Sequence, residues 1–196
     1  AMGIIPVGTG NDLAYGMGIP DDLDEACTTL AKNKRKTVDI GLVKGGDYPE
    51  GRYFGNGVGI GFDAAVGFEA EKVTWTRGLL AYLVAAMQTV FLYYKSPTVD
   101  ISYNDKTITQ PSLMISIMNG QRMGGGFYMA PESSPSDGEL DLCIAGEASK
   151  LRIFQLISLF LKGTQGSEPE ITTGRTKQIS VKAIKGTLPA HCDGET

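Results

Sequence analysis

The feature that most constrains the fold is a series of strand-like segments, joined by very short turns, that begins at residue 37. Residues 37–43 alternate between apolar and polar side chains, and Gly45-Gly46-Asp47 then predicts a hairpin into a partner strand over residues 52–60. Asn104-Asp105 predicts a second hairpin. Turns this short join antiparallel neighbours, because parallel strands need a crossover of about a dozen residues or more. We therefore expect mainly antiparallel sheets of about nine strands, with about four helices beside them.

Three longer segments have helical periodicity. Asp21 or Asp22 can cap a helix that ends near Lys34, and residues 149–163 predict a helix that starts with a serine cap and stops at a glycine. The apolar run Leu79–Tyr94 is long enough for about four helical turns. It is shorter than the roughly 20 residues that cross a bilayer, so we expect a helix packed mostly in the core.

Composition argues against some classes of protein. The formal net charge is −4, and only residues 32–36 form a basic cluster, which is typical of a solvated helix end, so we expect no nucleic-acid partner. No charged-then-apolar leader is present, which favours a cytoplasmic protein, and a start on a core strand suggests an excised piece of a longer chain. The cysteines form no zinc pattern and indicate free thiols in a reducing compartment: Cys27, Cys143 and Cys192.

The loop Gly8-Thr9-Gly10-Asn11-Asp12 is the first candidate binding site. It follows the apolar run Ile4–Val7, which predicts the end of a buried strand, and it precedes residues 13–17, which could open a short helix. A glycine-bracketed turn there lets backbone N–H groups approach an anion, and Asp12 could hold a metal. The alternative is an Asn-Asp turn that only caps a helix. The spacing leaves both interpretations open, since short glycine motifs are weak evidence.

Three further features are weaker candidates. Residues 55–63 resemble a dinucleotide fingerprint, but no clean strand-to-helix switch follows and no acidic residue stands at the ribose distance, so we reject a Rossmann site. Their glycines fit a strand that bends or packs closely. His191 and Cys192 are neighbours on a strand and point to opposite faces, which disfavours a catalytic pair. Asp39 is either solvent-facing or functional.

Two acidic turns complete the candidates. In Ser134–Glu139 one carboxylate and nearby carbonyls could bind a hard cation such as Mg²⁺ or Ca²⁺, although an Asp-Gly turn is often only a turn. In Asp193-Gly194-Glu195 the two carboxylates lie on one face of an extended chain, where they could take a proton from a hydroxyl and help position a metal. A polar hairpin is the alternative there.

Taken together, these motifs resemble the diacylglycerol kinase-like lipid kinases, which include bacterial diacylglycerol kinases and sphingosine kinases. Each motif is weak alone, but their order and spacing run through all 196 residues. The motifs are Ile4–Ala14, Val38-Asp39-Ile40-Gly41, Tyr53-Phe54-Gly55-Asn56, Gly59–Ala64, Asn119-Gly120, Gly124-Gly125-Gly126, Asp137–Asp141 and Asp193-Gly194-Glu195.

The resemblance implies an α+β fold dominated by a mainly antiparallel β-sandwich, preceded by a strand-loop-helix remnant of an α/β nucleotide domain. It places the remnant at residues 1–36 and the substrate-side sandwich at residues 37–196. The family's first phosphate motif, Gly-Gly-Asp-Gly-Thr, has no copy here, so we expect this chain to be an inactive truncation. The resemblance also implies ATP and Mg²⁺ as cofactors, a lipid such as diacylglycerol as substrate and peripheral contact with the membrane. It leaves a homodimer open.

The same resemblance assigns roles to residues. Gly8, Thr9, Gly10, Asn11 and Asp12 would bind the nucleotide, with Thr9 on the phosphates and Asp12 near Mg²⁺. Glu195 would be the general base on the lipid hydroxyl, with Asp193 beside it. A structural cation would be held by the loop at Ser134, Asp137 and Glu139, and Asp39 would belong to the acidic metal network. A sphingosine kinase-like or NAD kinase-like phosphotransferase and a non-catalytic lipid-binding sandwich are the alternatives.

Overall fold

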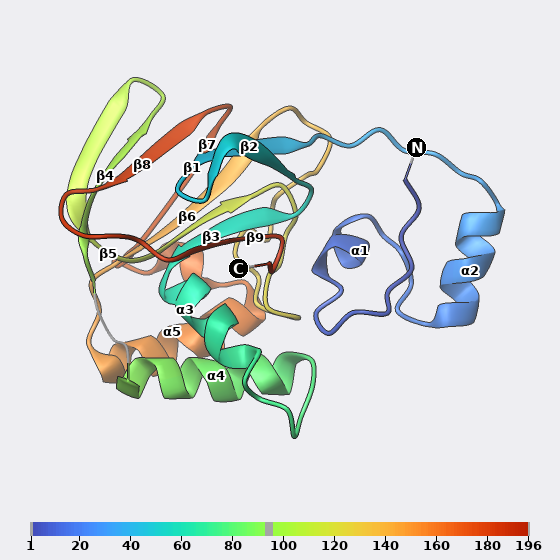
Figure 1. The fold of residues 1–196 in the computed structure, drawn as a ribbon, viewed down its shortest axis with the longest axis horizontal. Coiled ribbons are helices and arrows are strands. Elements are labelled where there is room, and N and C mark those ends of the chain that lie inside the picture. Colours follow the sequence, from blue (N-terminus) through green and yellow to red (C-terminus); the bar gives the residue numbers. More distant parts are fainter. Residues whose placement is uncertain (1, 93–95, 196) are drawn as a thin grey trace.

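The computed structural model describes residues 2–92 and 96–195, and it places an N-terminal segment beside a β-sandwich that helices cover on one face (Figure 1). The N-terminal segment holds two short helices, α1 (Asp12–Gly16) and α2 (Leu23–Ala31). The Asp22 carboxylate accepts two backbone N–H groups in the first turn of α2, so the predicted cap is confirmed. The strand predicted over Ile4–Val7 is wrong, because no described strand lies alongside it to form a ladder.

The strands form a two-stranded hairpin and a seven-stranded sheet. In the large sheet the order is β7-β6-β5-β3-β9, and β4 pairs with both β5 and β8. Every described pairing is antiparallel, which confirms the prediction from the short turns. The strands are β1 (Gly41–Gly45), β2 (Tyr48–Phe54), β3 (Gly57–Gly61), β4 (Thr98–Tyr103), β5 (Lys106–Met118), β6 (Leu140–Gly146), β7 (Ile171–Thr176), β8 (Ile179–Ala183) and β9 (Ala190–Cys192).

Strand β5 links the two halves of the sandwich. Its first half pairs with β4 across the predicted hairpin, in which Asn104 and Asp105 both have positive φ angles, of 47° and 59°. Its second half lies between β3 and β6. One strand therefore carries the chain from the outer layer to the layer that helices cover.

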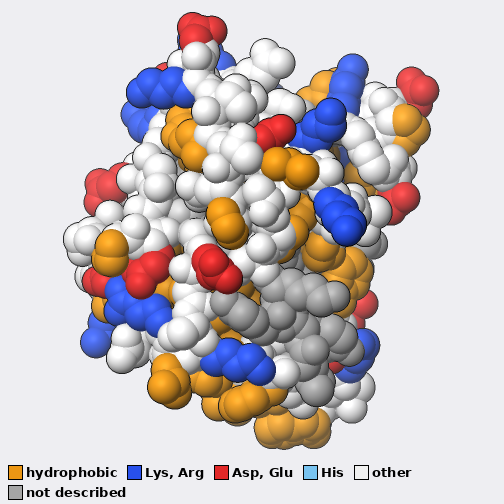
Figure 2. All heavy atoms as spheres, turned by 90° about the vertical axis from the view of Figure 1, so that its left-hand side faces the viewer, with side chains coloured by type: hydrophobic (Ala, Val, Ile, Leu, Met, Phe, Trp, Pro, Cys, Tyr) orange, Lys and Arg blue, Asp and Glu red, His pale blue; other side chains and the backbone are white. Residues whose placement is uncertain are grey.

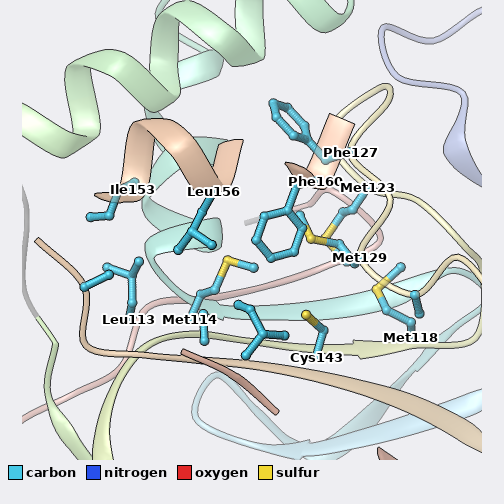
Figure 3. Packing of buried hydrophobic residues seen from close by; sticks show 14 of the residues in the cluster. Leu113, Met114, Met118, Met123, Phe127, Met129, Cys143, Ile153, Leu156 and Phe160 are labelled. Carbon is cyan, nitrogen blue, oxygen red and sulfur yellow. The ribbon is translucent and has the colours of Figure 1, made fainter. Parts of the chain in front are cut away.

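The large sheet buries both of its faces. On one face Ile115 and Ile117 of β5 pack with apolar side chains of the outer strands. On the other face Met114 and Met118 point toward the helices and meet Phe160 and other apolar side chains (Figure 3). This alternation along β5 is the period-two pattern of a central strand.

Three helices cover that second face: α3 (Phe62–Ala70), α4 (Leu79–Leu92) and α5 (Lys150–Lys162), followed by the short 3₁₀ helix η1 (Gln165–Ser167). The Ser149 hydroxyl accepts the N–H of Arg152, and α5 ends at Gly163 with a φ of 70°, as the sequence predicts. The helix predicted over Leu79–Tyr94 is confirmed as far as Leu92, and the last two residues of the prediction lie outside the described residues. Within the described ranges, the helices are all too short or too polar to cross a bilayer.

Two expectations for the segment around Gly55 are wrong. The strand predicted over residues 52–60 is broken at Gly55-Asn56, because β2 pairs with β1 whereas β3 joins the large sheet. A strand-to-helix switch also exists, since β3 passes into α3 through Gly61, whose φ is 85°. Strand β3 is antiparallel to both of its neighbours, so the segment still lacks the parallel arrangement of a dinucleotide site.

Candidate functional site

Asn11 closes the N-terminal glycine loop. It has a φ of 53°, its side-chain Oδ1 accepts the N–H of Gly8 at 2.9 Å, and its Nδ2 donates to the carbonyl of Pro6 at 3.4 Å. Its side chain makes no hydrogen bond to the helix that follows, so the cap alternative does not describe this loop. Helix α1 has only five residues, too few to add much positive potential at the loop. Thr9 is exposed, with its hydroxyl available to a ligand.

Asp12 fastens this loop to the sandwich. Its Oδ2 accepts the N–H of Gly125 at 2.8 Å, and its Oδ1 lies 3.0 Å from Nε of Arg122. The Arg122 guanidinium lies over the ring of Tyr15, 3.6 Å from its centroid. Burial raises the pKa of Asp12, against the lowering effects of the Gly125 hydrogen bond and the Arg122 charge.

Gly10 allows the N-terminal loop to approach the loop at Gly125 closely. A side chain at Gly10 would lie 3.3 Å from the backbone nitrogen of Gly125, which is tighter than ordinary contact. The sequence placed both glycines in candidate loops, and the structure brings these two loops together although more than a hundred residues separate them.

Asp193 lies in a cradle of backbone amides. Its Oδ2 accepts the N–H of Gly55 at 2.7 Å, and its Oδ1 accepts those of Asn56 and Gly57, both at 2.9 Å. Gly55 and Asn56 lie between β2 and β3, and Gly57 is the first residue of β3, so the three amides face Asp193 where the chain passes from one strand to the next. Both oxygens of Asp193 are therefore engaged in holding the C-terminal turn against the break between the two strands.

Glu195 turns away from Asp193. Its carboxylate pairs with the guanidinium of Arg52, which also donates to the hydroxyl of Tyr48 at 2.8 Å. The Glu195 side chain is 72% exposed. The structure thus brings Asp193, but not the side chain of Glu195, to the cleft that holds Asp12.

Asp63, to which no motif assigned a role, and His191, which was disfavoured as part of a catalytic pair, both lie in that cleft. The Nε2 of His191 is 3.6 Å from Oδ2 of Asp63, and its Nδ1 accepts the N–H of Gly194 at 3.3 Å. Burial disfavours the charged form of His191, which is 5% exposed, but the hydrogen bond and charge of Asp63 outweigh this and raise the pKa. Gly59 lies opposite His191 in the ladder, and a side chain at Gly59 would come within 2.4 Å of both groups.

The cleft has a volume of about 450 Å³ and is lined from both parts of the chain. The N-terminal loop forms one side, and α3, α4 and β9 form the other, so the carboxylates of Asp12, Asp63 and Asp193 share one polar space. A cleft with exposed loop amides on one wall and carboxylates on the other can hold a polyphosphate and a hydroxyl that donates a proton.

Asp39 lies in a different place. Its Oδ2 accepts the N–H of Gly138 at 2.8 Å, and its own N–H donates to the carbonyl of Pro135 at 2.8 Å. It therefore joins the predicted cation loop and is not part of the cleft around Asp12. Ser134 is half-buried within the same loop.

The acidic side chains of this loop have partners within the protein. Asp137 uses Oδ1 to accept the N–H of Glu139 at 3.1 Å and Oδ2 to pair with Arg175. Arg175 also lies 3.5 Å from the Glu139 carboxylate. Across the described residues, three or more His, Cys, Asp or Glu side chains nowhere gather closely enough to hold a metal.

Comparison with known proteins identifies the larger part of the chain. Residues 56–196 match the family described as the YegS C-terminal NAD kinase beta sandwich-like domain. The chain belongs to this family. Residues 1–43 match the diacylglycerol kinase catalytic domain. The expected resemblance and the sandwich fold of this YegS-type domain are thereby confirmed, and the boundary between residues 36 and 37 stays a prediction.

Individual relatives agree with the family. The chain is 28% identical over 195 residues to a diacylglycerol kinase of Mycobacterium tuberculosis and 30% identical over 198 residues to one of Bacillus subtilis. In each case the matched region covers 99% of this chain and 62% of the relative, so this chain spans less than two thirds of the length of these relatives. A solved diacylglycerol kinase structure from Bacillus anthracis str. Sterne matches with a TM-score of 0.70 and 22% identity, covering 99% of this chain and 61% of that one. That likeness shows the fold.

Proposed function

We propose that this chain is the substrate-side part of an ATP-dependent lipid kinase that transfers the γ-phosphoryl group of ATP to a hydroxyl of diacylglycerol, giving phosphatidic acid and ADP. The observation that carries the proposal is the single cleft lined both by the Gly8–Asp12 loop and by Asp63, His191 and Asp193 of the sandwich. Membership of the sandwich family and the catalytic-domain match at residues 1–43 support it. A sandwich that only binds lipid would have no need of the polar wall.

The nucleotide side of the cleft is the N-terminal loop. Its glycines bring the backbone close to the phosphates, and the exposed Thr9 hydroxyl can donate to a phosphate oxygen. Mg²⁺ is held in kinases chiefly by the phosphates with one or two carboxylates, so the lack of a larger protein cluster in the described residues is compatible with it. Asp12 would supply such a carboxylate, and a metal ion there would take the place of Arg122 beside its Oδ1. Bound Mg²⁺ neutralises charge on the phosphates.

The acceptor side is the C-terminal turn. The lipid oxygen forms a bond to the γ-phosphorus while the bond to the ADP oxygen breaks, and the hydroxyl proton passes to the carboxylate of Glu195. Asp193 is a positioning residue, since its oxygens hold the turn through three backbone amides. Glu195 can act only when it leaves Arg52, which its exposure permits.

The lipid would be met at a membrane surface, and α4 offers the face for it. Leu80, Met87 and Phe91 are spaced as i, i+7 and i+11, so they lie along one stripe of the helix, and all three are exposed. Leu151 at the start of α5 is 78% exposed, and the ammonium group of Lys150 lies 5.8 Å from the centroid of the Phe91 ring. In the space-filling view, hydrophobic side chains gather along the lower edge, where α4 and α5 lie (Figure 2). An apolar stripe beside a cation suits an anionic bilayer.

The kinase proposal is tested by transfer of radiolabelled phosphate from ATP to diacylglycerol in mixed micelles with Mg²⁺. We expect no turnover by the 196 residues alone, because they contain no Gly-Gly-Asp-Gly-Thr motif, and turnover by a protein in which a segment with that motif precedes them. Turnover by the 196 residues alone would contradict the expectation that the missing Gly-Gly-Asp-Gly-Thr motif is needed for catalysis. Sphingosine and NAD are assayed beside diacylglycerol, and failure of the longer protein on every lipid would overturn the proposal.

Glu195→Gln tests the base in that longer protein. We expect a loss of turnover of at least about 100-fold with unchanged unfolding, the size typical of a lost general base. Glu147→Gln, at an exposed site in the loop after β6, is the matched control. Unchanged turnover in Glu195→Gln would remove Glu195 from the mechanism without removing the kinase proposal.

The membrane proposal is tested by co-sedimentation of the 196 residues with vesicles of phosphatidylcholine, with and without phosphatidylglycerol. We expect binding to the anionic vesicles and a loss of about tenfold in the double variant Met87→Ser/Phe91→Ser. The control is Leu23→Ser/Leu30→Ser on α2, where the side chains are 49% and 47% exposed, close to the 48% of Met87. Equal binding by the two double variants would place the contact elsewhere.

A further inference from the structure

Three carboxylates surround one guanidinium at the end of the large sheet. Arg175 of β7 stands directly opposite Asp141 of β6, with its Nε 3.5 Å from Oδ1 of Asp141. The same Nε lies 3.5 Å from Oε2 of Glu139, and one terminal nitrogen pairs with Oδ2 of Asp137. Glu139 and Asp141 are two residues apart, so an extended chain presents them on one side.

The backbone holds both sides of this cluster in place. The carbonyl of Arg175 accepts a hydrogen bond from Nδ2 of Asn104 at 2.7 Å, which fastens β7 to the β4–β5 hairpin. On the other side, Asp39 receives the N–H of Gly138 and donates its own N–H to Pro135. The guanidinium therefore meets a loop that is held by hydrogen bonds to Asp39.

The charges define what this arrangement does. Burial raises the pKa of Asp141, and the Arg175 charge acts in the opposite direction. A planar guanidinium can serve several carboxylates at once, because its N–H donors fan out in one plane. A divalent ion bound to Asp137 would have to displace the guanidinium from that carboxylate.

We propose that Arg175 is the built-in cation of the loop at residues 134–141, so that the intact protein binds no divalent ion there and needs none to keep the loop folded. The inference concerns a place away from the cleft and does not rest on the kinase proposal. It is an alternative to the cation site expected from the sequence, because the loop has the acidic groups for a metal while the chain supplies the positive charge.

The test is thermal unfolding of the 196-residue chain in EDTA, in excess Mg²⁺ and in excess Ca²⁺, with Ca²⁺ binding followed by calorimetry. For the wild type we expect the same melting temperature within about 1 °C in all three and no saturable heat. Arg175→Gln should melt lower in EDTA and recover by about 3 °C or more in Ca²⁺, because the carboxylates then lack a counter-ion. Arg175→Lys keeps the charge and should respond little.

Arg152→Gln is the matched control. Arg152 also forms ion pairs with two carboxylates, those of Glu168 and Glu170, at another edge of the fold. Its replacement should lower the melting temperature without creating a response to Ca²⁺. A saturable rise in the wild-type melting temperature with either ion would overturn the proposal. So would an Arg175→Gln variant whose response to Ca²⁺ equals that of Arg152→Gln.

Discussion

The amide cradle around Asp193 gives the most direct test of how the site is assembled. Asp193→Ala removes the acceptor for the N–H groups of Gly55, Asn56 and Gly57 at once, and nothing else in the turn can replace it. Asp193→Asn is the milder change. It keeps an oxygen at the Oδ1 position, which serves two of the three amides, but it sets an NH₂ group against the N–H of Gly55.

The magnitude follows from the geometry. A hydrogen bond to a charged acceptor contributes about 1.5–3 kcal/mol, and the low end applies because water reaches Asp193. Three such bonds that act together and are not fully additive give a loss of about 3 kcal/mol for Asp193→Ala. For Asp193→Asn we expect about 1 kcal/mol. In a chain of this size each kcal/mol lowers the melting temperature by about 2–4 °C, so the two variants should differ by several degrees.

The assay is urea unfolding followed by circular dichroism, with thermal unfolding as a second measurement. Asp21→Ala is the control, since Asp21 is exposed and takes part in none of the hydrogen bonds or ion pairs found in the described residues. The order wild type, Asp193→Asn, Asp193→Ala is expected. If Asp193→Ala unfolds within about 0.5 kcal/mol of Asp21→Ala, the amides do not depend on the carboxylate and the reasoning fails.

Three further predictions concern the core, the cleft and pH. Burial raises the pKa of the Cys143 thiol to about 12, so in the native chain a thiol reagent should label the exposed Cys27 within minutes and Cys143 only after unfolding in urea. Gly59→Ala should lower stability by about 1–3 kcal/mol, because the new methyl group would overlap the Asp63–His191 pair, whereas Gly166→Ala, with 3.9 Å to its nearest neighbour, should cost less than about 1 kcal/mol in urea unfolding. The raised pKa of Asp12 means that the folded state holds its proton longer, so unfolding free energy should fall as pH rises from 3.8 through the folded pKa, and Asp12→Asn should remove that slope.

Most of the sandwich could be predicted from local patterns because its connections are local. The turn at Asn104-Asp105 and the cap and stop of α5 each involve residues that are close in sequence, and their outcomes match the prediction. The segment around Gly55 could not be predicted this way. Whether it continues one strand or changes sheet depends on Asp193, which lies far along the chain and competes for its amides.

The candidate site was predicted only in part, for the same reason. Glycine and carboxylate motifs pointed to the loop at Gly10 and to Asp193, but nothing in their spacing indicates which carboxylate faces the cleft. His191 was set aside because its neighbour Cys192 points the other way, although its partner is Asp63 on α3. The useful signal was Gly59, a strand glycine whose missing side chain leaves room for that pair.

The two carboxylates of the C-terminal turn, Asp193 and Glu195, have different partners and therefore different roles. The two residues are chemically alike and stand two positions apart. Asp193 accepts hydrogen bonds from three backbone amides, whereas Glu195 forms an ion pair with the side chain of Arg52. A carboxylate fixed by backbone amides holds the shape of the turn, whereas one paired at the surface can exchange partners at low cost. If the kinase proposal is right, the motif needs both: an acid that builds the turn, and a second one that the turn carries to the acceptor hydroxyl.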